Sequence, residues 1–257
     1  IQHWKKAAYM NLVGFKDSSV SVINAAGQYQ FSAYIGMMFP KKSQTNNANN
    51  MTSILIPIKK ADGSASIETG FVASNDTIIL PWSASPAHFA ALFRVLKGRE
   101  YGWGSTNFYT DCSAEMKAIF SSFGIFLPRN TQSQGLAGHV VDIHHLSPEK
   151  RSQYLIKHGA PLLTLVHVKG HILLYVGAYR DKNINHGHPF PLSYQQVWSL
   201  YPKDKSSRSV IGKAVFIPLL TYYSEDPHLA PQLTNEIFEL IYLNQFPVMP
   251  LKQRLSI

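Results

Sequence analysis

The clearest hydrophobic pattern in the chain follows its single cysteine, Cys112. Apolar residues recur there at i, i+3, i+4 and i+7, which is one face of an amphipathic helix. These apolar positions are Met116, Ile119, Phe120 and Phe123. Gly124 then occupies the place where a residue in the left-handed conformation ends a helix. The pattern predicts a buried helix with Cys112 in its first turn.

The residues just before the cysteine predict a loop, because glycine and small polar residues dominate residues 102–107. A helix N-terminus presents unpaired N–H groups and the positive end of the helix dipole. A thiolate at that position is therefore stabilised, and the pKa of the thiol falls. A lone cysteine is also often a small buried core residue, so this stretch alone leaves both interpretations open.

A histidine inside an apolar sheet supplies a second signal. Residues 161–169 form a β-rich apolar run, Gly170 marks a turn, and His171 opens a second run that ends at Gly177. A thiolate at a helix start facing a histidine on a strand is the papain-like arrangement, in which the base takes the thiol proton. A third polar group bonds the far ring nitrogen and fixes the tautomer. Nucleophilic cysteine chemistry is therefore the leading hypothesis.

Earlier in the chain the pattern changes to short strands with turn signals between them, notably at residues 25–27 and 62–63. A small β-barrel fits this pattern. Residues 41–50 contain four asparagines and no apolar run, which predicts an exposed loop. The expected strands cover residues 20–23, 29–35, 53–59 and 77–80.

Two further helices are expected. Pro86, placed at a first helical position, begins a helix that runs to Leu96. Near the C-terminus, apolar residues form a helical stripe over residues 233–243, and we expect this helix to pack on the domain. The stripe consists of Leu233, Ile237, Leu240 and Ile241.

Composition bounds the class of protein. A chain of 257 residues with 45% apolar residues predicts one or two globular domains, and no apolar run is long enough to span a membrane. The formal charge of +9 suits a polyanionic envelope or a nucleic acid, but no nucleic-acid recognition motif is present. One cysteine allows no internal disulfide. Because the chain starts with Ile, we expect a signal segment or a further domain to be missing from it.

Several histidine pairs resemble metal ligands. His167 and His171 have helical ligand spacing, but on a strand residues four apart lie roughly 13 Å from each other, too far for one metal. His186 and His188 lie in a polar loop, where metal binding would be adventitious. His144 and its neighbour His145 are interpreted as a solvated pair. We expect no metal and no other cofactor.

Four blocks in order, residues 101–104, 111–113, 124–130 and 170–177, resemble the NlpC-type cell-wall cysteine peptidases. The similarity is greatest to the subgroup that carries bacterial SH3-like domains and cuts γ-D-glutamyl–diamino acid bonds. The resemblance covers residues 18–220 and implies an α+β protein, with a papain-like catalytic domain behind a small SH3-like β-barrel. The implied division is a remnant at 1–17, a barrel at 18–82, a catalytic domain at 83–222 and a helical tail at 223–257.

The third catalytic residue departs from the subgroup. Relatives place a histidine before a Trp-Gly motif on the strand after the base, and here Gln195 stands at that position. Its amide oxygen can accept a hydrogen bond from His171. His186, within an apparent insertion at residues 181–191, is the competing candidate. We favour Gln195.

The resemblance also implies substrate-binding residues. Asp111 and Ser113 would hold the free amine of an N-terminal L-Ala, because a carboxylate beside an ammonium forms a charge-assisted bond. Tyr101 would lie near the oxyanion position, with Trp103 and Thr131 as further substrate contacts. Asp111 has a second interpretation as an N-cap of the Cys112 helix, and both roles can hold.

The function expected from these signals is hydrolysis of γ-D-glutamyl–diamino acid bonds in peptidoglycan stem peptides by a Cys112–His171–Gln195 triad. The alternatives are a papain-like amidase, deamidase or acyltransferase, and a non-catalytic envelope-binding module. We expect a monomer in the bacterial envelope, periplasmic or secreted, whose partners are stem peptides rather than nucleic acid or a membrane.

Overall fold

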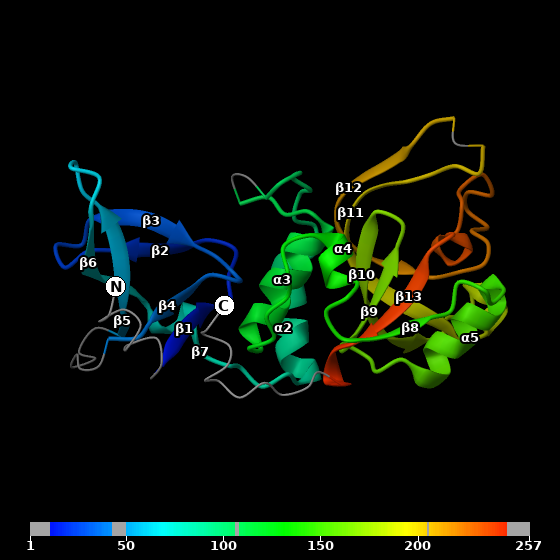
Figure 1. Ribbon diagram of the computed structural model, residues 1–257, viewed down its shortest axis with the longest axis horizontal. Coiled ribbons are helices and arrows are strands. Elements are labelled where there is room, and N and C mark those ends of the chain that lie inside the picture. The colour runs from blue at the N-terminus through cyan, green and yellow to red at the C-terminus, as the bar shows by residue number, and fades with distance from the viewer. Residues whose placement is uncertain (1–10, 43–49, 106–107, 205, 246–257) are drawn as a thin grey trace. The chain divides into compact units, whose positions relative to one another are not determined.

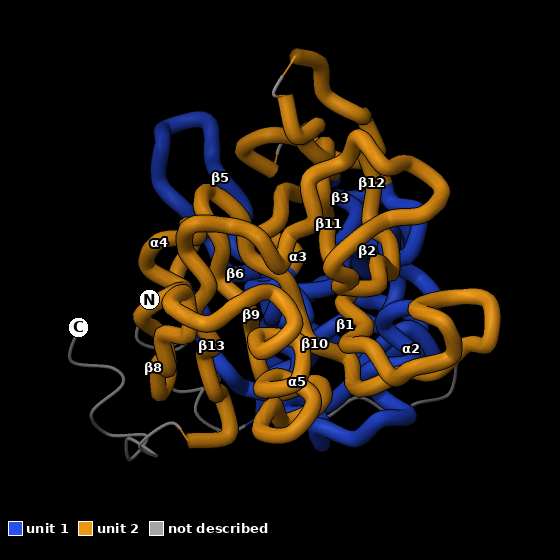
Figure 2. Tube along the Cα trace, turned by 90° about the vertical axis from the view of Figure 1, so that its right-hand side faces the viewer, with its two compact units in different colours: residues 1–99, 106–108, 116–127 blue, residues 100–105, 109–115, 128–257 orange. Residues whose placement is uncertain are grey.

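The structure is a computed structural model that describes residues 11–42, 50–105, 108–204 and 206–245 (Figure 1). Most of the expected remnant, residues 1–10, and most of the asparagine-rich loop, residues 43–49, lie outside the described residues. The chain divides into two compact units, each with its own buried core. Unit 1 comprises residues 1–99, 106–108 and 116–127, and unit 2 comprises residues 100–105, 109–115 and 128–257 (Figure 2).

Unit 1 contains two antiparallel sheets, with strand orders β4-β1-β7 and β3-β2-β6-β5. In β2, Val20 and Val22 are buried and Ser21 is exposed, because successive side chains of a strand point to opposite faces. The buried faces of the two sheets share one apolar core. The strands are β1 (Leu12–Phe15), β2 (Val20–Ile23), β3 (Tyr29–Ala33), β4 (Met38–Pro40), β5 (Met51–Lys59), β6 (Ala65–Ala73) and β7 (Thr77–Leu80).

The expected β-barrel is not confirmed, because the two sheets do not close on each other. Between them the described residues form the isolated bridge Lys41–Ile54 rather than a continuous ladder. The four expected strands are present, two of them with the predicted bounds. Sequence patterns missed β1, β4 and β6, which are short or interrupted by polar residues.

The predicted helices of unit 1 are confirmed. Helix α2 (Pro86–Leu96) has the expected bounds, and the Ser85 side chain caps it by accepting from the His88 N–H. Helix α3 (Cys112–Ser122) begins in unit 2 and continues into unit 1. Its predicted apolar stripe is buried, and the Phe89 ring of α2 lies 4.3 Å from the Phe123 ring, centroid to centroid.

Unit 2 is built around a six-stranded antiparallel sheet of order β12-β11-β10-β9-β13-β8. Two connections matter for the site: the short β9–β10 turn presents His171, and the longer segment between β12 and β13 approaches β11. The strands are β8 (His139–Asp142), β9 (Thr164–Val168), β10 (His171–Tyr179), β11 (Phe190–Leu200), β12 (Ser209–Pro218) and β13 (Phe238–Tyr242). The helices are α4 (Thr131–Gln134) and α5 (Pro148–His158), with short 3₁₀ turns η1 (Ser74–Asp76), η2 (Asn185–Gly187), η3 (Gln232–Thr234) and η4 (Leu243–Gln245) in the chain.

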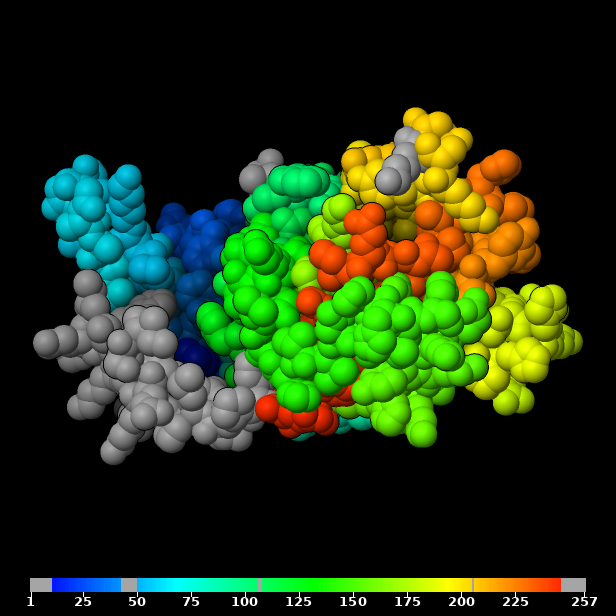
Figure 3. All heavy atoms as spheres, turned by 45° about the vertical axis from the view of Figure 1, so that its right-hand side comes forward, coloured from blue at the N-terminus to red at the C-terminus, as the bar shows by residue number. Residues whose placement is uncertain are grey.

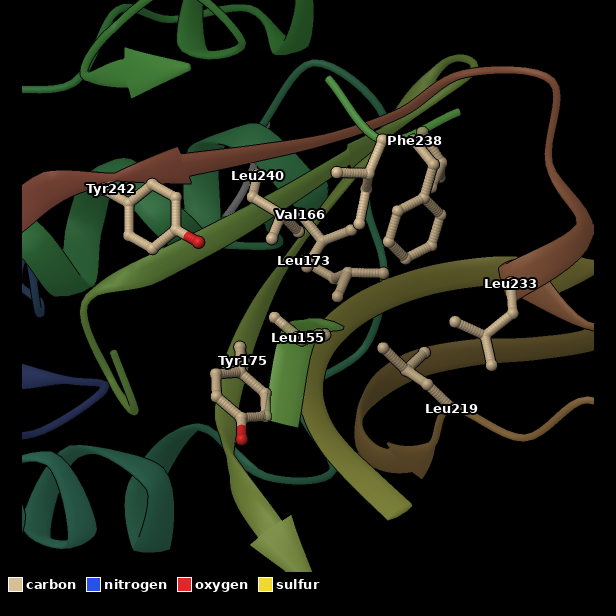
Figure 4. Close-up of a cluster of buried hydrophobic side chains, with 11 residues drawn as sticks. Leu155, Val166, Leu173, Tyr175, Leu219, Leu233, Phe238, Leu240 and Tyr242 are labelled. Atoms are coloured by element: carbon tan, nitrogen blue, oxygen red, sulfur yellow. The ribbon is translucent and has the colours of Figure 1, made fainter. Parts of the chain in front are cut away.

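The main core of unit 2 gathers side chains from three neighbouring strands and from α5 (Figure 4). Val166 of β9, Leu173 of β10 and Leu240 of β13 are fully buried together with Leu155 of α5. Alternate residues along each strand face this core, which is the pattern of a sheet covered on that face. The strand that carries His171 is therefore anchored by buried side chains on this face and by its pairing with β9 and β11.

The helix expected at residues 233–243 is wrong, because the chain there forms η3 and strand β13. Strand β13 pairs with β8 along one edge and with β9 along the other, and four of its five residues are buried. A strand with two buried faces carries apolar residues at every position, and such a run mimics helical spacing. Figure 3 shows this orange-to-red part of the chain lying against the green residues that include β8.

Among the described residues, none of the helices combines the length and the apolar character needed to cross a membrane.

Candidate active site

The loop before α3 is shaped by a close packing contact and a cap. A Cβ on Gly102 would lie 2.1 Å from the Cβ of Tyr109, so only glycine fits there. At the helix start the Asp111 carboxylate accepts from the Ala114 N–H at 2.9 Å. The cap interpretation of Asp111 is thus confirmed, and Cys112 begins the helix with 6% of its surface exposed.

His171 reaches the cysteine because a tight turn places it at the first position of β10. Gly170 adopts φ +73°, a conformation that side chains rarely take, and lets β9 and β10 pair directly as Val168 with His171. The ring is partly buried and hydrogen-bonds the Cys112 side chain. The backbone N–H of Ile172, the next residue, also bonds the sulfur.

These contacts favour a thiolate–imidazolium pair. Burial alone would raise the pKa of Cys112, but hydrogen bonds from His171, Thr131 and Ile172, with the charge of His171, lower it below its usual value. Burial alone would lower the pKa of His171, but the bond to Cys112 and its negative charge, with the bond to Gln195, raise it. These shifts favour the thiolate, which is the nucleophilic form of the sulfur.

Thr131 contacts the sulfur directly, with 3.6 Å between its Oγ1 and the Cys112 Sγ. It is the first residue of α4, whose start is capped by the Asn130 side chain accepting from the Ser133 N–H at 2.8 Å. The structure thus brings Thr131 to the nucleophile. The sequence resemblance assigned it to substrate.

Gln195, on β11, contacts the far nitrogen of the imidazole. Its Oε1 lies 2.9 Å from His171 Nε2, and its side chain is fully buried. The competing residue, His186, is exposed in η2, a turn in the connection from β10 to β11. Of these two candidates, the structure brings Gln195 to His171.

Asp111 has a partner that the sequence did not predict. Arg129 forms a two-pronged ion pair with it, at 3.0 Å to Oδ1 and 2.7 Å to Oδ2. Arg129 also bonds Ser113 and Ser105 through their hydroxyls. Burial opposes ionisation of Asp111, but Arg129 and the Ala114 N–H hold the pKa of the carboxyl below its usual value.

Tyr101 lies beside the charged groups, while Trp103 lies out in solvent. Burial, together with the Cys112 and Asp111 charges, raises the pKa of Tyr101 to about 12, so the phenol stays protonated as a donor. Its ring packs 5.8 Å from the Trp198 ring and 6.5 Å from the Trp103 ring. Trp103 is 82% exposed and free to meet a ligand.

A buried carboxylate, Glu115, was also missed from the sequence. It is fully buried in the first turn of α3 and accepts from the Thr110 hydroxyl at 2.7 Å and the Tyr194 hydroxyl at 2.6 Å. Gln196 in turn bonds Thr110. The residues 194–196 of β11 therefore touch the helix start, the base and the loop, an arrangement that short-range sequence patterns do not encode.

Within the part of the chain that the structure describes, no three candidate metal ligands lie together. His167 instead pairs with Glu239 of the neighbouring strand β13 at 2.7 Å. Together these features define the class of site: a cysteine thiolate at a helix start, a histidine on a strand and a buried amide behind it.

Comparison with protein families gives the same class. Residues 98–205, less than half of the chain, match the model of the NlpC/P60 family. These residues include Cys112, His171 and Gln195. The chain therefore contains an NlpC/P60 family domain.

Solved structures share the fold. A structure described as a novel NlpC/P60 endopeptidase from Photobacterium damselae subsp. piscicida is 24% identical, with a TM-score of 0.77, and covers 96% of this chain. An NlpC/P60 family protein from Bacillus cereus is 15% identical, with a TM-score of 0.55, and covers 90% of this chain. This chain spans 56% and 65% of those two chains. No curated protein matches it.

Proposed function

We propose that this chain is a cysteine peptidase of bacterial cell-wall peptides and that it cuts the bond between the γ-carboxyl of D-glutamate and a diamino acid. The observation that carries the proposal is geometric: Cys112 begins a helix, His171 hydrogen-bonds it, and Gln195 Oε1 lies 2.9 Å from the far nitrogen of His171, inside an NlpC/P60 domain. NlpC/P60 proteins are generally cysteine peptidases acting on such peptides. The sequence blocks described above support the γ-D-glutamyl subgroup.

In the first half-reaction the Cys112 thiolate attacks the carbonyl carbon and forms a carbon–sulfur bond, which moves an electron pair onto the carbonyl oxygen. His171 then gives its proton to the leaving amine nitrogen as the carbon–nitrogen bond breaks. The products are a free amine and a thioester on Cys112. The lowered pKa of Cys112 and the raised pKa of His171 favour a charged pair, in which the thiol has already given up its proton.

In the second half-reaction a water attacks the thioester while neutral His171 takes one of its protons. The carbon–sulfur bond breaks, the sulfur leaves as a thiolate, and the acid product is released. The imidazolium and thiolate are then both restored.

The developing oxyanion needs donors in each half-reaction. First-turn N–H groups of a helix have no partner within the helix, so the Cys112 N–H is available. The Tyr101 hydroxyl, protonated because burial and two neighbouring negative charges raise its pKa to about 12, is the second donor. Loss of one such donor lowers kcat by roughly 10²-fold or more.

Asp111 as an anchor for a free amine is a separate part of the proposal. Both of its oxygens already accept from Arg129, so an ammonium would join a neutralised pair. We therefore expect free-amine peptides to be preferred by no more than about tenfold over N-acetylated ones. A hundredfold preference would support a stronger anchor, and equal cutting would remove this role from Asp111.

The experiment that tests the proposed function uses defined stem peptides. The protein is incubated with L-Ala-γ-D-Glu-diamino acid peptides, with the α-linked isomers as matched controls, and products are identified by mass. Release of the dipeptide only from the γ-linked series supports the proposal. Cutting of both series, or transfer to an added amine in place of hydrolysis, would favour the amidase and acyltransferase alternatives.

The proposed location is the bacterial envelope, periplasmic or secreted. The support is electrostatic: the formal charge of +9 favours residence near an anionic cell-wall polymer. The β-sheets of unit 1 are proposed to act there as an SH3-like wall-binding part. Sedimentation of the protein with purified murein, and its release by salt, tests both ideas.

A further inference from the structure

The amide of Gln195 has four hydrogen-bonding positions, and all four are filled. Its Oε1 accepts from His171 Nε2 at 2.9 Å and from Gln232 Nε2 at 2.8 Å. Its Nε2 donates to Ser193 Oγ at 2.9 Å and to Gln232 Oε1 at 3.0 Å. An amide offers two acceptor and two donor positions, so this one is saturated.

Ser193 decides which end of that amide faces the histidine. Its hydroxyl donates its one proton to the Ile217 carbonyl at 2.7 Å, so toward Gln195 it only accepts. The NH₂ group must then face Ser193, and the amide oxygen must face His171. Because that oxygen only accepts, His171 carries a proton on Nε2. In the neutral ring, Nδ1 is therefore the basic nitrogen left for Cys112.

Gln232 holds the plane of the same amide. If Gln195 alone turned over, oxygen would face oxygen at one contact with Gln232 and nitrogen would face nitrogen at the other. Gln232 is 9% exposed and lies in η3, beyond the residues that match the family model. Arg151 of α5 fixes η3 in turn, donating at 2.7 Å to the carbonyls of Leu233 and Asn235.

We propose that Ser193 and Gln232 are positioning residues of the active site, which lock the Gln195 amide so that His171 keeps Nδ1 directed to Cys112. The physical need for them follows from the third residue being a neutral amide. A carboxylate presents an acceptor whichever way it turns, whereas an amide turned over presents a donor and selects the wrong tautomer. The kinetic part of this inference rests on the proposed function, but the tautomer does not.

The direct test reads the tautomer without turnover. In Cys112→Ala protein with ¹⁵N-labelled histidine, NMR above the pKa of His171 should show its ring protonated on Nε2, the signal being assigned by its loss in His171→Ala. Adding Ser193→Ala and Gln232→Met together should bring in the Nδ1-protonated form. An unchanged tautomer in this protein would overturn the proposal. If the combined variant fails to fold, the same NMR measurement is made on Ser193→Ala alone in the Cys112→Ala background. The Nδ1-protonated form supports the proposal there, and an unchanged tautomer overturns it.

Kinetics give a second readout in the protein with Cys112 intact. Each single change should lower kcat by about tenfold with KM unchanged, because neither residue touches substrate. The double change should lower kcat by about 10³-fold, more than the two single losses combined. Gln153→Met, a matched change of an exposed glutamine on α5, should leave kcat unaltered. Strictly additive losses would contradict the proposal, and an inactive unmodified protein would remove the proposed function while leaving the NMR test intact.

Discussion

Two segments build the active site in different ways: the nucleophile segment, residues 100–115, and the C-terminal segment, residues 219–245. In the nucleophile segment the Asp111 carboxylate caps helix α3 by accepting from the N–H of Ala114, three residues later in the chain. Cys112 is the first residue of that helix. In the C-terminal segment Gln232 and β13 acquire their places only through partners far away in the chain. The helix that begins at Cys112 was predicted from the sequence, whereas residues 233–243 of the second segment were predicted as a helix and form η3 and β13.

The difference between the two segments shows which parts of the site can be predicted from near neighbours in the sequence. A helix cap acts within one turn, so the residues that place Cys112 at the helix start lie close together in sequence. The groups that lower the pKa of its thiol, His171, Thr131 and Ile172, come from distant parts of the chain. Strand β13 contacts β9 across 72 residues, as in the pair His167–Glu239. Pairing with β8 and β9 stabilises these residues as a strand, since β-propensity reflects packing against neighbouring strands. The variants below separate chemistry in the first segment from support by the second.

The largest effect is expected in the nucleophile segment, from Cys112→Ala. Turnover should fall by at least roughly 10³-fold because no other group replaces the thiolate. The thermal midpoint should move little, since a small buried side chain is replaced by another small one. Peptide hydrolysis followed by mass, with a melting curve on the same sample, checks both statements. Retained hydrolysis would end the thiol mechanism.

Phe238→Ala tests the C-terminal segment. The ring is fully buried in the unit 2 core, and its removal should lower the free energy of unfolding by about 3–5 kcal/mol. Chemical denaturation measures this loss. Ile237→Ala, a partly exposed neighbour, serves as the control and should lower it by less than about 1.5 kcal/mol. Equal losses would mean that β13 is not held by its core face.

The pH dependence of kcat/KM tests how Cys112 of the nucleophile segment depends on His171, a partner far away in the chain. Activity should fall as pH drops through the lowered pKa of Cys112, because the thiolate is protonated, and again as pH rises through the raised pKa of His171, because the imidazolium is lost. Each limb should change about tenfold per pH unit. Gln195→Leu should move the alkaline limb to lower pH, since the Gln195 bond helps to raise the pKa of His171. If the alkaline limb stays at the same pH in Gln195→Leu, that limb does not report the pKa of His171.

The smallest effect is expected from Trp103→Ala. This side chain is 82% exposed, so the free energy of unfolding should change by less than about 0.5 kcal/mol. If Trp103 meets substrate, KM should rise a few-fold with kcat unchanged, as for loss of uniform binding. The matched control is Tyr179→Ala, which removes an exposed aromatic side chain from the end of β10. An equal rise in KM for both would remove Trp103 from the binding surface.

By itself, the sequence determined the parts that depend on near neighbours. The spacing after Cys112 defined a helix face that is indeed buried, the Gly170 turn gave His171 its strand, and Pro86 and Ser85 set the start of α2. Each of these rests on a period, a turn or a cap that a few residues encode completely.

Only the tertiary structure decided the remainder. It turned residues 238–242 into a strand between β9 and β8, paired Asp111 with Arg129, and buried Glu115 beside Tyr194. It also placed Gln232 against Gln195. These contacts join residues far apart in the chain, and a buried polar group takes whichever partner the packed sheet brings within reach. No periodic pattern in the sequence predicts these contacts, because the free energy of each contact arises only when the two segments pack together.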